Sequence, residues 1–174
     1  FELIHILFSY YLEDNRVENI QLIVSQYYDL YQRDNTPKHT FIYFKDMARY
    51  LSQNGEYIEA VSYYSKLREM MDSHNADYFD RNEYCLISYN EALCFMHLNE
   101  FEEAYNILSN IIEYVDELPN EEYRGNIYHT YAIICIKLRK SCADEYKKKA
   151  YDYQKFNPIS LALSHGEYGK YYFE

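Results

Sequence analysis

The sequence predicts an all-α protein, folded as a right-handed α-solenoid of about four stacked helical hairpins. Three observations lead to this class. Apolar residues recur at helical period along almost all of the 174 residues, and only short polar stretches interrupt them. With 48% hydrophobic and 19% aromatic residues, the chain is too apolar to be disordered. Its four glycines and three prolines are too few for a turn-rich β-sandwich or barrel.

The polar interruptions divide the chain into about eight helices, which pair through very short turns. We expect a single repeat domain over residues 1–174, with one hairpin for each pair of helices. The first of these hairpins has apolar residues at helical period but lacks the residue pattern that the later hairpins repeat. The expected hairpins cover roughly residues 1–32, 39–73, 82–116 and 122–156, with a truncated one from 158.

A small residue recurs in the first helix of each later hairpin. Ala48, Ala92, Ala132 and Gly169 lie 44, 40 and 37 positions apart. Only a small side chain lets two helix axes approach closely enough for ridges to pack into grooves. Asn99 lies in the turn after the helix that contains Ala92, at a position where glycine is expected. Asn is the usual substitute for glycine where the backbone is left-handed.

The second hairpin carries this pattern most fully, with Ala48, a turn at Gly55, an aromatic Tyr57 and a second small residue, Ala60. This arrangement resembles a tetratricopeptide repeat. The spacing is longer than the roughly 34 residues of a standard repeat, so extended helices are expected. A second copy uses Ala92, Phe95, Phe101 and Ala104, and a third becomes degenerate around Ala143 and Ala150.

Residues 41–172 also resemble the regulatory domain of Rgg/PlcR-type peptide-pheromone receptors of Gram-positive bacteria. The resemblance rests on a Tyr-rich composition and on residues 88–93 (Ser-Tyr-Asn-Glu-Ala-Leu), with supporting stretches at 99–104, 126–139 and 145–150. It implies a transcriptional regulator whose repeats bind a short secreted peptide and form a homodimer. It implies DNA contact only through a helix-turn-helix domain that is not part of this chain. The chain lacks an initiator Met and ends within a helical pattern, which indicates a piece of a larger protein.

Helical phase indicates which side chains face the concave groove of such a stack. Asn90 matches the Asn with which the family contacts peptide backbone, and Asn126 is a second candidate on phase alone. An Asn amide can pair with both the C=O and the N–H of one peptide residue. Arg49 and Lys45 are candidates for a peptide carboxylate, although solvated surface charges remain an alternative. The other candidate peptide-binding residues, for some of which a core role is the alternative, are Asp46, Leu86, Leu93, Met96, Thr130 and Ile133.

A constitutive interaction scaffold of the carboxylate-clamp kind is the alternative function. Lys45, Arg49 and Asn90 supply part of such a clamp, but His129 and Ile133 occupy its far side. The partner would then be a segment of another protein. We expect neither an enzyme nor a cofactor or metal site, because no catalytic or metal-ligand spacing is present.

Charge and cysteine usage exclude further classes. A formal charge of -11 leaves no basic face for nucleic acid or anionic lipid, and no apolar run reaches the roughly 18 residues of a membrane span. Cys85, Cys94, Cys135 and Cys142 are expected to be free thiols, which indicates a cytoplasmic protein. Cys135 and Cys142 are expected to lie two turns apart on one helix, too far to bridge.

Overall fold

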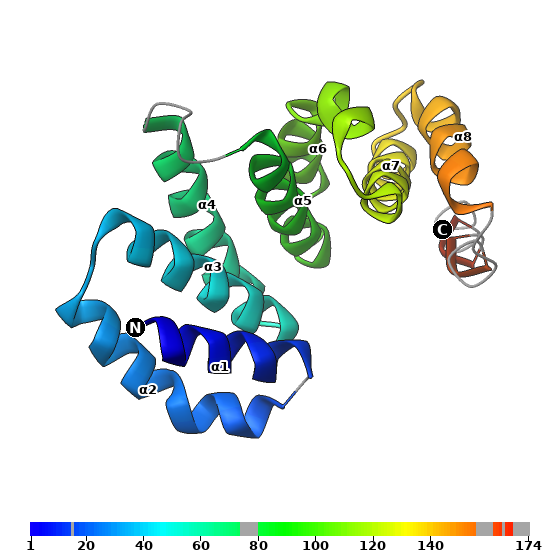
Figure 1. Cartoon of the computed structure of the whole chain (residues 1–174). Coiled ribbons are helices and arrows are strands. Elements are labelled where there is room, and N and C mark those ends of the chain that lie inside the picture. The colour runs from blue at the N-terminus through cyan, green and yellow to red at the C-terminus, as the bar shows by residue number, and fades with distance from the viewer. Residues whose placement is uncertain (15, 74–79, 156–161, 165, 169–174) are drawn as a thin grey trace. The chain divides into compact units, whose positions relative to one another are not determined.

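Every regular element that the computed structural model describes, in residues 1–14, 16–73, 80–155, 162–164 and 166–168, is a helix. The all-helical class is therefore confirmed. The chain forms two compact units, which we call unit 1 (Phe1–Tyr78) and unit 2 (Phe79–Glu174). Unit 1 holds α1 (Glu2–Glu13), α2 (Val17–Arg33), α3 (Pro37–Gln53) and α4 (Tyr57–Ser73) (Figure 1). Unit 2 holds α5 (Arg81–His97), α6 (Phe101–Ser109), the 3-10 helix η1 (Ile112–Glu117), α7 (Glu121–Lys137) and α8 (Ala143–Gln154).

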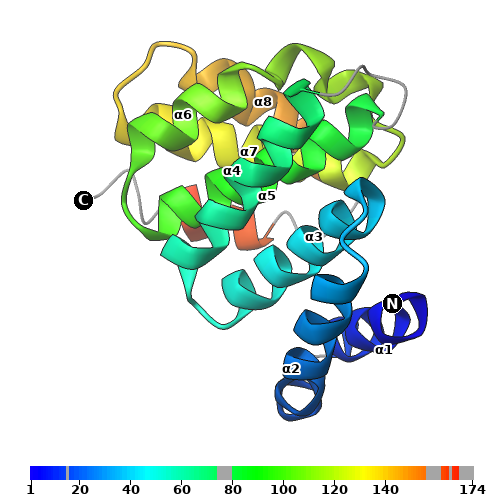
Figure 2. The ribbon, with the colours of Figure 1, turned by 90° about the vertical axis from the view of Figure 1, so that its left-hand side faces the viewer.

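Helices adjacent in sequence pack as pairs. In unit 1, α1 pairs with α2 and α3 with α4, and α3 also contacts α1 and α2 (Figures 1 and 2). Aromatic rings fill the space between them. Tyr27 is fully buried, and its ring centroid lies 5.1 Å from both Phe8 and Tyr43. Rings of this size supply a large buried apolar area, which stabilises so short a stack of helices.

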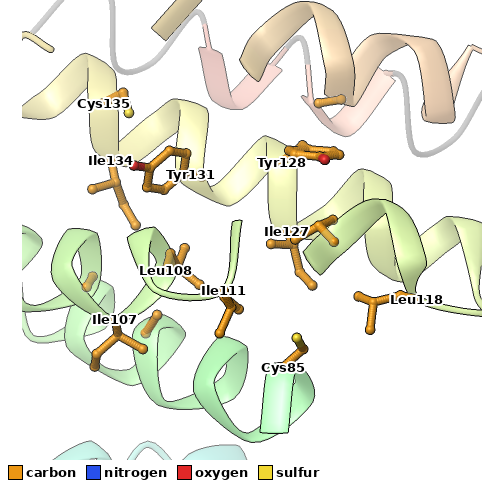
Figure 3. Packing of buried hydrophobic residues seen from close by; sticks show 14 residues of the cluster. Cys85, Ile107, Leu108, Ile111, Leu118, Ile127, Tyr128, Tyr131, Ile134 and Cys135 are labelled. Carbon is orange, nitrogen blue, oxygen red and sulfur yellow. The ribbon is translucent and has the colours of Figure 1, made fainter. Parts of the chain in front are cut away.

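In unit 2, α5 pairs with α6 and α7 with α8, and α6 also contacts α7. Figure 2 shows α8 lying along α7. Ile127 and Ile134 of α7 point toward Leu108 and Ile111, and these four side chains are fully buried (Figure 3). α6 ends at Ser109, earlier than the expected hairpin boundary, and η1 completes the connection to α7.

The small residues of the repeated pattern lie at the buried contacts. Ala48, Ala92 and Ala132 of the first helices have no exposed surface, and neither have Ala60 and Ala104 of the second helices. Ala150 of α8 is also fully buried, although the pattern around it is degenerate. Gly169 and residues 158–161 of the truncated hairpin lie outside the described residues.

Three tight turns between paired helices share one backbone conformation. Gly55, Asn99 and Arg139 have φ values of 81°, 62° and 54°, so the left-handed conformation expected at Asn99 is confirmed. Each of them donates its N–H to the carbonyl three residues before it, at 3.0 to 3.2 Å. Each also lies seven residues after one of the buried alanines, Ala48, Ala92 and Ala132 in turn. The combination of a buried alanine and a left-handed turn seven residues later therefore occurs three times.

The arrangement of Cys135 and Cys142 differs from the sequence-based expectation. α7 ends at Lys137 and the chain reverses at Arg139, so Cys142 caps the start of α8 rather than continuing α7. The two Sγ atoms lie 3.1 Å apart. The expectation that these thiols are too far apart to bridge was wrong because it assumed one straight helix.

None of the described helices is both long enough and apolar enough to cross a lipid bilayer.

Candidate functional site

Unit 2 contains a cavity of about 440 Å³, which we call the unit 2 cavity. Three parts of the chain line it: one face of α5, one face of α7, and the end of α8 with the residues that follow it. This volume lies in the range of small-ligand sites. Its lining includes Tyr89, Leu93, Met96 and His97 of α5, Glu122, Asn126, His129, Thr130 and Ile133 of α7, and Gln154, Leu163, Ser164 and Glu167.

The α7 side of the cavity is a regular helical face. Asn126, His129, Thr130 and Ile133 stand three, four and seven positions apart, so their side chains project to the same side of the helix. Glu122 continues this face into the first turn of α7. An acidic residue is favourable there because it complements the positive end of the helix dipole.

The α5 side contributes Tyr89, Leu93 and Met96. Burial raises the pKa of Tyr89 and the negative charge of Glu167 adds to the rise, whereas the interaction with the side chain of Thr130 on α7 opposes it. Tyr89 therefore stays protonated at neutral pH and keeps an O–H group at the cavity wall.

His129 and Glu167 form a close polar contact in the cavity wall. Nε2 of His129 lies 2.5 Å from Oε2 of Glu167. The His129 side chain is only 10% exposed, and its Nδ1 is buried without a hydrogen-bond partner among the described residues. Because only Nε2 has an acceptor, the neutral ring is best satisfied as the Nε2–H tautomer, donating to a charged Glu167. The ring of Tyr168 packs against His129 edge-on, with centroids 4.7 Å apart.

The end of α8 is fixed against α7 and against the residues that follow it. A Cβ atom added at Gly125 would lie 3.1 Å from Cβ of Tyr153 and 3.2 Å from Cγ of Gln154, so this glycine permits the close approach of the two helices. The buried Gln154 accepts a 2.7 Å hydrogen bond from Oγ of Ser164. Gln154 and Ser164 also line a smaller cavity of about 290 Å³, together with Lys147 and Lys148.

The structure brings together five of the predicted site residues in the unit 2 cavity: Leu93, Met96, Asn126, Thr130 and Ile133. Leu86 and Asn90 do not line it. Leu93 and Met96 line the cavity at the predicted phase, and Tyr89 rather than Asn90 completes the α5 side of the wall. Asn90 itself is half-buried.

The other three predicted residues belong to α3 of unit 1. Asp46 is completely buried there and does not line an open groove: its Oδ2 lies 2.6 Å from Nδ1 of His5 and accepts a 2.7 Å hydrogen bond from Tyr27. That prediction was wrong, because α1 and α2 cover this face of α3. Nζ of Lys45 lies 5.9 Å from the ring centroid of Phe41, and Arg49 is half-buried.

His129, Gln154 and Ser164 are cavity residues that the sequence-based reasoning missed as candidates. Helical spacing alone gives a signal for His129, which lies three residues after Asn126 on the same face. Gln154 and Ser164 come from separate segments and leave no local pattern. Among the described residues, no three His, Cys, Asp or Glu side chains gather in a group that could hold a metal ion.

The sequence matches no protein-family model, and no curated protein matches it either.

Proposed function

We propose that this chain binds a short peptide in the unit 2 cavity and is the peptide-binding sensor and dimerisation domain of a transcriptional regulator. The observation that carries the peptide-binding part is the composition of the cavity wall. Side-chain amides and hydroxyls of Asn126, Thr130 and Gln154 stand beside the apolar side chains of Leu93 and Ile133. A peptide presents the same alternation of polar main chain and apolar side chains.

The repeated unit of buried alanine and left-handed turn supports a tetratricopeptide-like α-solenoid. Solenoids of this kind bind extended segments on the inner faces of successive first helices. α5 and α7 are two such helices, and both line the cavity. The homodimer, the regulator and the DNA contact through another domain rest on the resemblance of residues 41–172 to peptide-pheromone receptors.

The test of peptide binding uses a random heptapeptide display library, followed by calorimetric titration of the selected peptides. Asn126→Ala should weaken binding about tenfold, because a buried amide lost from a peptide contact costs about 1–2 kcal/mol. Asn90→Ala is the matched control, since it removes the same group from a residue outside the cavity wall. Its affinity should stay within about twofold of the wild type.

Two results would contradict the proposal. If the library yields no peptide that the protein binds, the function is wrong. If Asn90→Ala weakens binding and Asn126→Ala does not, the peptide lies on another surface.

The scaffold alternative of the carboxylate-clamp kind receives less support. A clamp needs cationic side chains at the ligand, but the carboxylates in the described cavity wall are Glu122 and Glu167, and Lys45 and Arg49 belong to unit 1. Binding of peptides that end in a free Asp carboxylate, with loss of binding on amidation, would favour this alternative.

A further inference from the structure

The described wall of the unit 2 cavity is acidic. It contains two carboxylates, Glu122 from the start of α7 and Glu167 from the segment after α8, and neither Lys nor Arg is among its described residues. Lys147 and Lys148 line the smaller cavity instead. A partly enclosed wall of one charge sign concentrates ligands of the opposite sign, because the protein screens charge less than water does.

The carboxylate of Glu167 lies at the cavity wall, where 57% of its side chain remains exposed. Its Oε2 is 2.5 Å from the largely buried His129, which fixes the carboxylate at the wall. Its negative charge also contributes to the raised pKa of Tyr89, another residue of the cavity wall.

Apolar and aromatic groups stand next to these carboxylates. Leu93, Met96 and Ile133 line the same cavity and can cover the carbon atoms of a ligand whose charged end reaches a carboxylate. The phenol ring of Tyr89 adds an aromatic face, which attracts a cation when the two come close. The wall thus fits a ligand group that is cationic at one end and apolar along its length.

We propose that the unit 2 cavity selects peptides through a cationic nitrogen group, an N-terminal ammonium or a Lys or Arg side chain, bound by the carboxylates of Glu122 and Glu167. This inference rests on the peptide-binding function proposed above and names the chemical class of peptide that the cavity takes. Apolar residues next to the cationic group occupy the part of the cavity lined by Leu93, Met96 and Ile133.

The experiment repeats the heptapeptide selection on the wild type, on Glu122→Gln/Glu167→Gln and on the control Glu121→Gln. Glu121 is an exposed neighbour in the first turn of α7 and does not line the cavity, so its variant changes the net charge without changing the wall. Wild type and control should enrich peptides with a Lys or an Arg beside apolar residues, or with apolar residues directly after the free N-terminus that all displayed peptides share. The double variant should lose that preference.

The best selected peptide is then synthesised with a free or an acetylated N-terminus, and with each Lys or Arg replaced by norleucine. Removing the cationic group that is bound should weaken binding about twofold to fivefold, as expected for an exposed charge pair. The double variant should bind the free and the modified peptides equally well. Which modification weakens binding identifies the source of the cation.

The outcomes separate this inference from the proposed function. If peptides bind with an affinity that depends on Asn126 but not on any cationic group, the inference is wrong and the peptide-binding function stands. If Glu121→Gln weakens binding as much as the double variant, general attraction to an acidic protein explains the preference and the inference is wrong. If no peptide binds at all, both are wrong.

Discussion

Replacing Arg139 with glycine should stabilise the protein, because Arg139 has a φ of 54° in the turn between α7 and α8. In this left-handed region the Cβ of an L-residue lies too close to the following carbonyl oxygen, at a cost of about 1–2 kcal/mol. Glycine avoids that contact but loses about 0.5–1 kcal/mol more chain entropy on folding. The net gain expected for Arg139→Gly is therefore about 0.5–1 kcal/mol.

Arg139→Ala separates this backbone effect from the loss of the side chain. Alanine keeps the Cβ atom, and the side chain of Arg139 is exposed, so this variant should change stability by less than about 0.5 kcal/mol. Gly55→Ala gives the opposite test at the equivalent turn of unit 1. A Cβ atom there would meet no atom within 4 Å, so the expected loss of about 1 kcal/mol comes from the backbone alone.

Urea unfolding followed by circular dichroism at 222 nm measures all three variants. A gain of about 0.5–1 kcal/mol shifts the midpoint upward by a few tenths molar at ordinary slopes. The reasoning is refuted if Arg139→Gly is no more stable than Arg139→Ala, or if Gly55→Ala is more stable than the wild type. Either result would mean that the three turns do not share one strained conformation.

Three further predictions concern the packing and ionisation of buried groups. Gly125→Ala should lower the thermal midpoint, because its Cβ atom would lie 3.1 Å from Cβ of Tyr153 on α8. Gly166→Ala is the control and should leave the midpoint unchanged, because no atom lies within 4 Å of its Cβ position. Equal effects of the two variants would contradict the close approach of α7 and α8. The oxidant diamide should join Cys135 and Cys142 in one disulfide, because their Sγ atoms lie 3.1 Å apart. A thiol assay should then show two fewer free thiols, and mass spectra should show the two cysteine peptides linked. Cys142→Ser should abolish both signals. Burial raises the pKa of Cys85 to about 11. From about pH 9 upward the unfolded chain ionises this thiol and the folded chain does not, so the urea midpoint should fall between pH 9 and 11, and a constant midpoint would contradict this.

The sequence was informative where one local signal decides the structure. The left-handed turn at Asn99 follows from its place between two apolar-periodic segments, and the structure has it there. Arg139 adopts the same conformation without a favourable side chain, so residue type gives no hint of it. Its distance of seven residues from Ala132 was the available signal, since Gly55 and Asn99 stand at the same distance from their own alanines.

Long-range contacts explain most of the differences at the candidate site. Helical phase placed Asn126, Thr130 and Ile133 on one face of their helix, and all three line the unit 2 cavity. It failed at Asp46, whose partner His5 lies 41 residues away, and no local pattern reports that α1 covers this face. The contact of His129 with Glu167 spans 38 residues and is invisible for the same reason.

The most direct test of the central claim locates the bound peptide. A selected heptapeptide is titrated into uniformly ¹⁵N-labelled protein, and the amide chemical shifts of the whole chain are followed. Binding in the unit 2 cavity predicts the largest changes at Leu93, Asn126, Thr130 and Ile133. The largest changes in α3 or α4 of unit 1, with those four amides unmoved, would contradict the account.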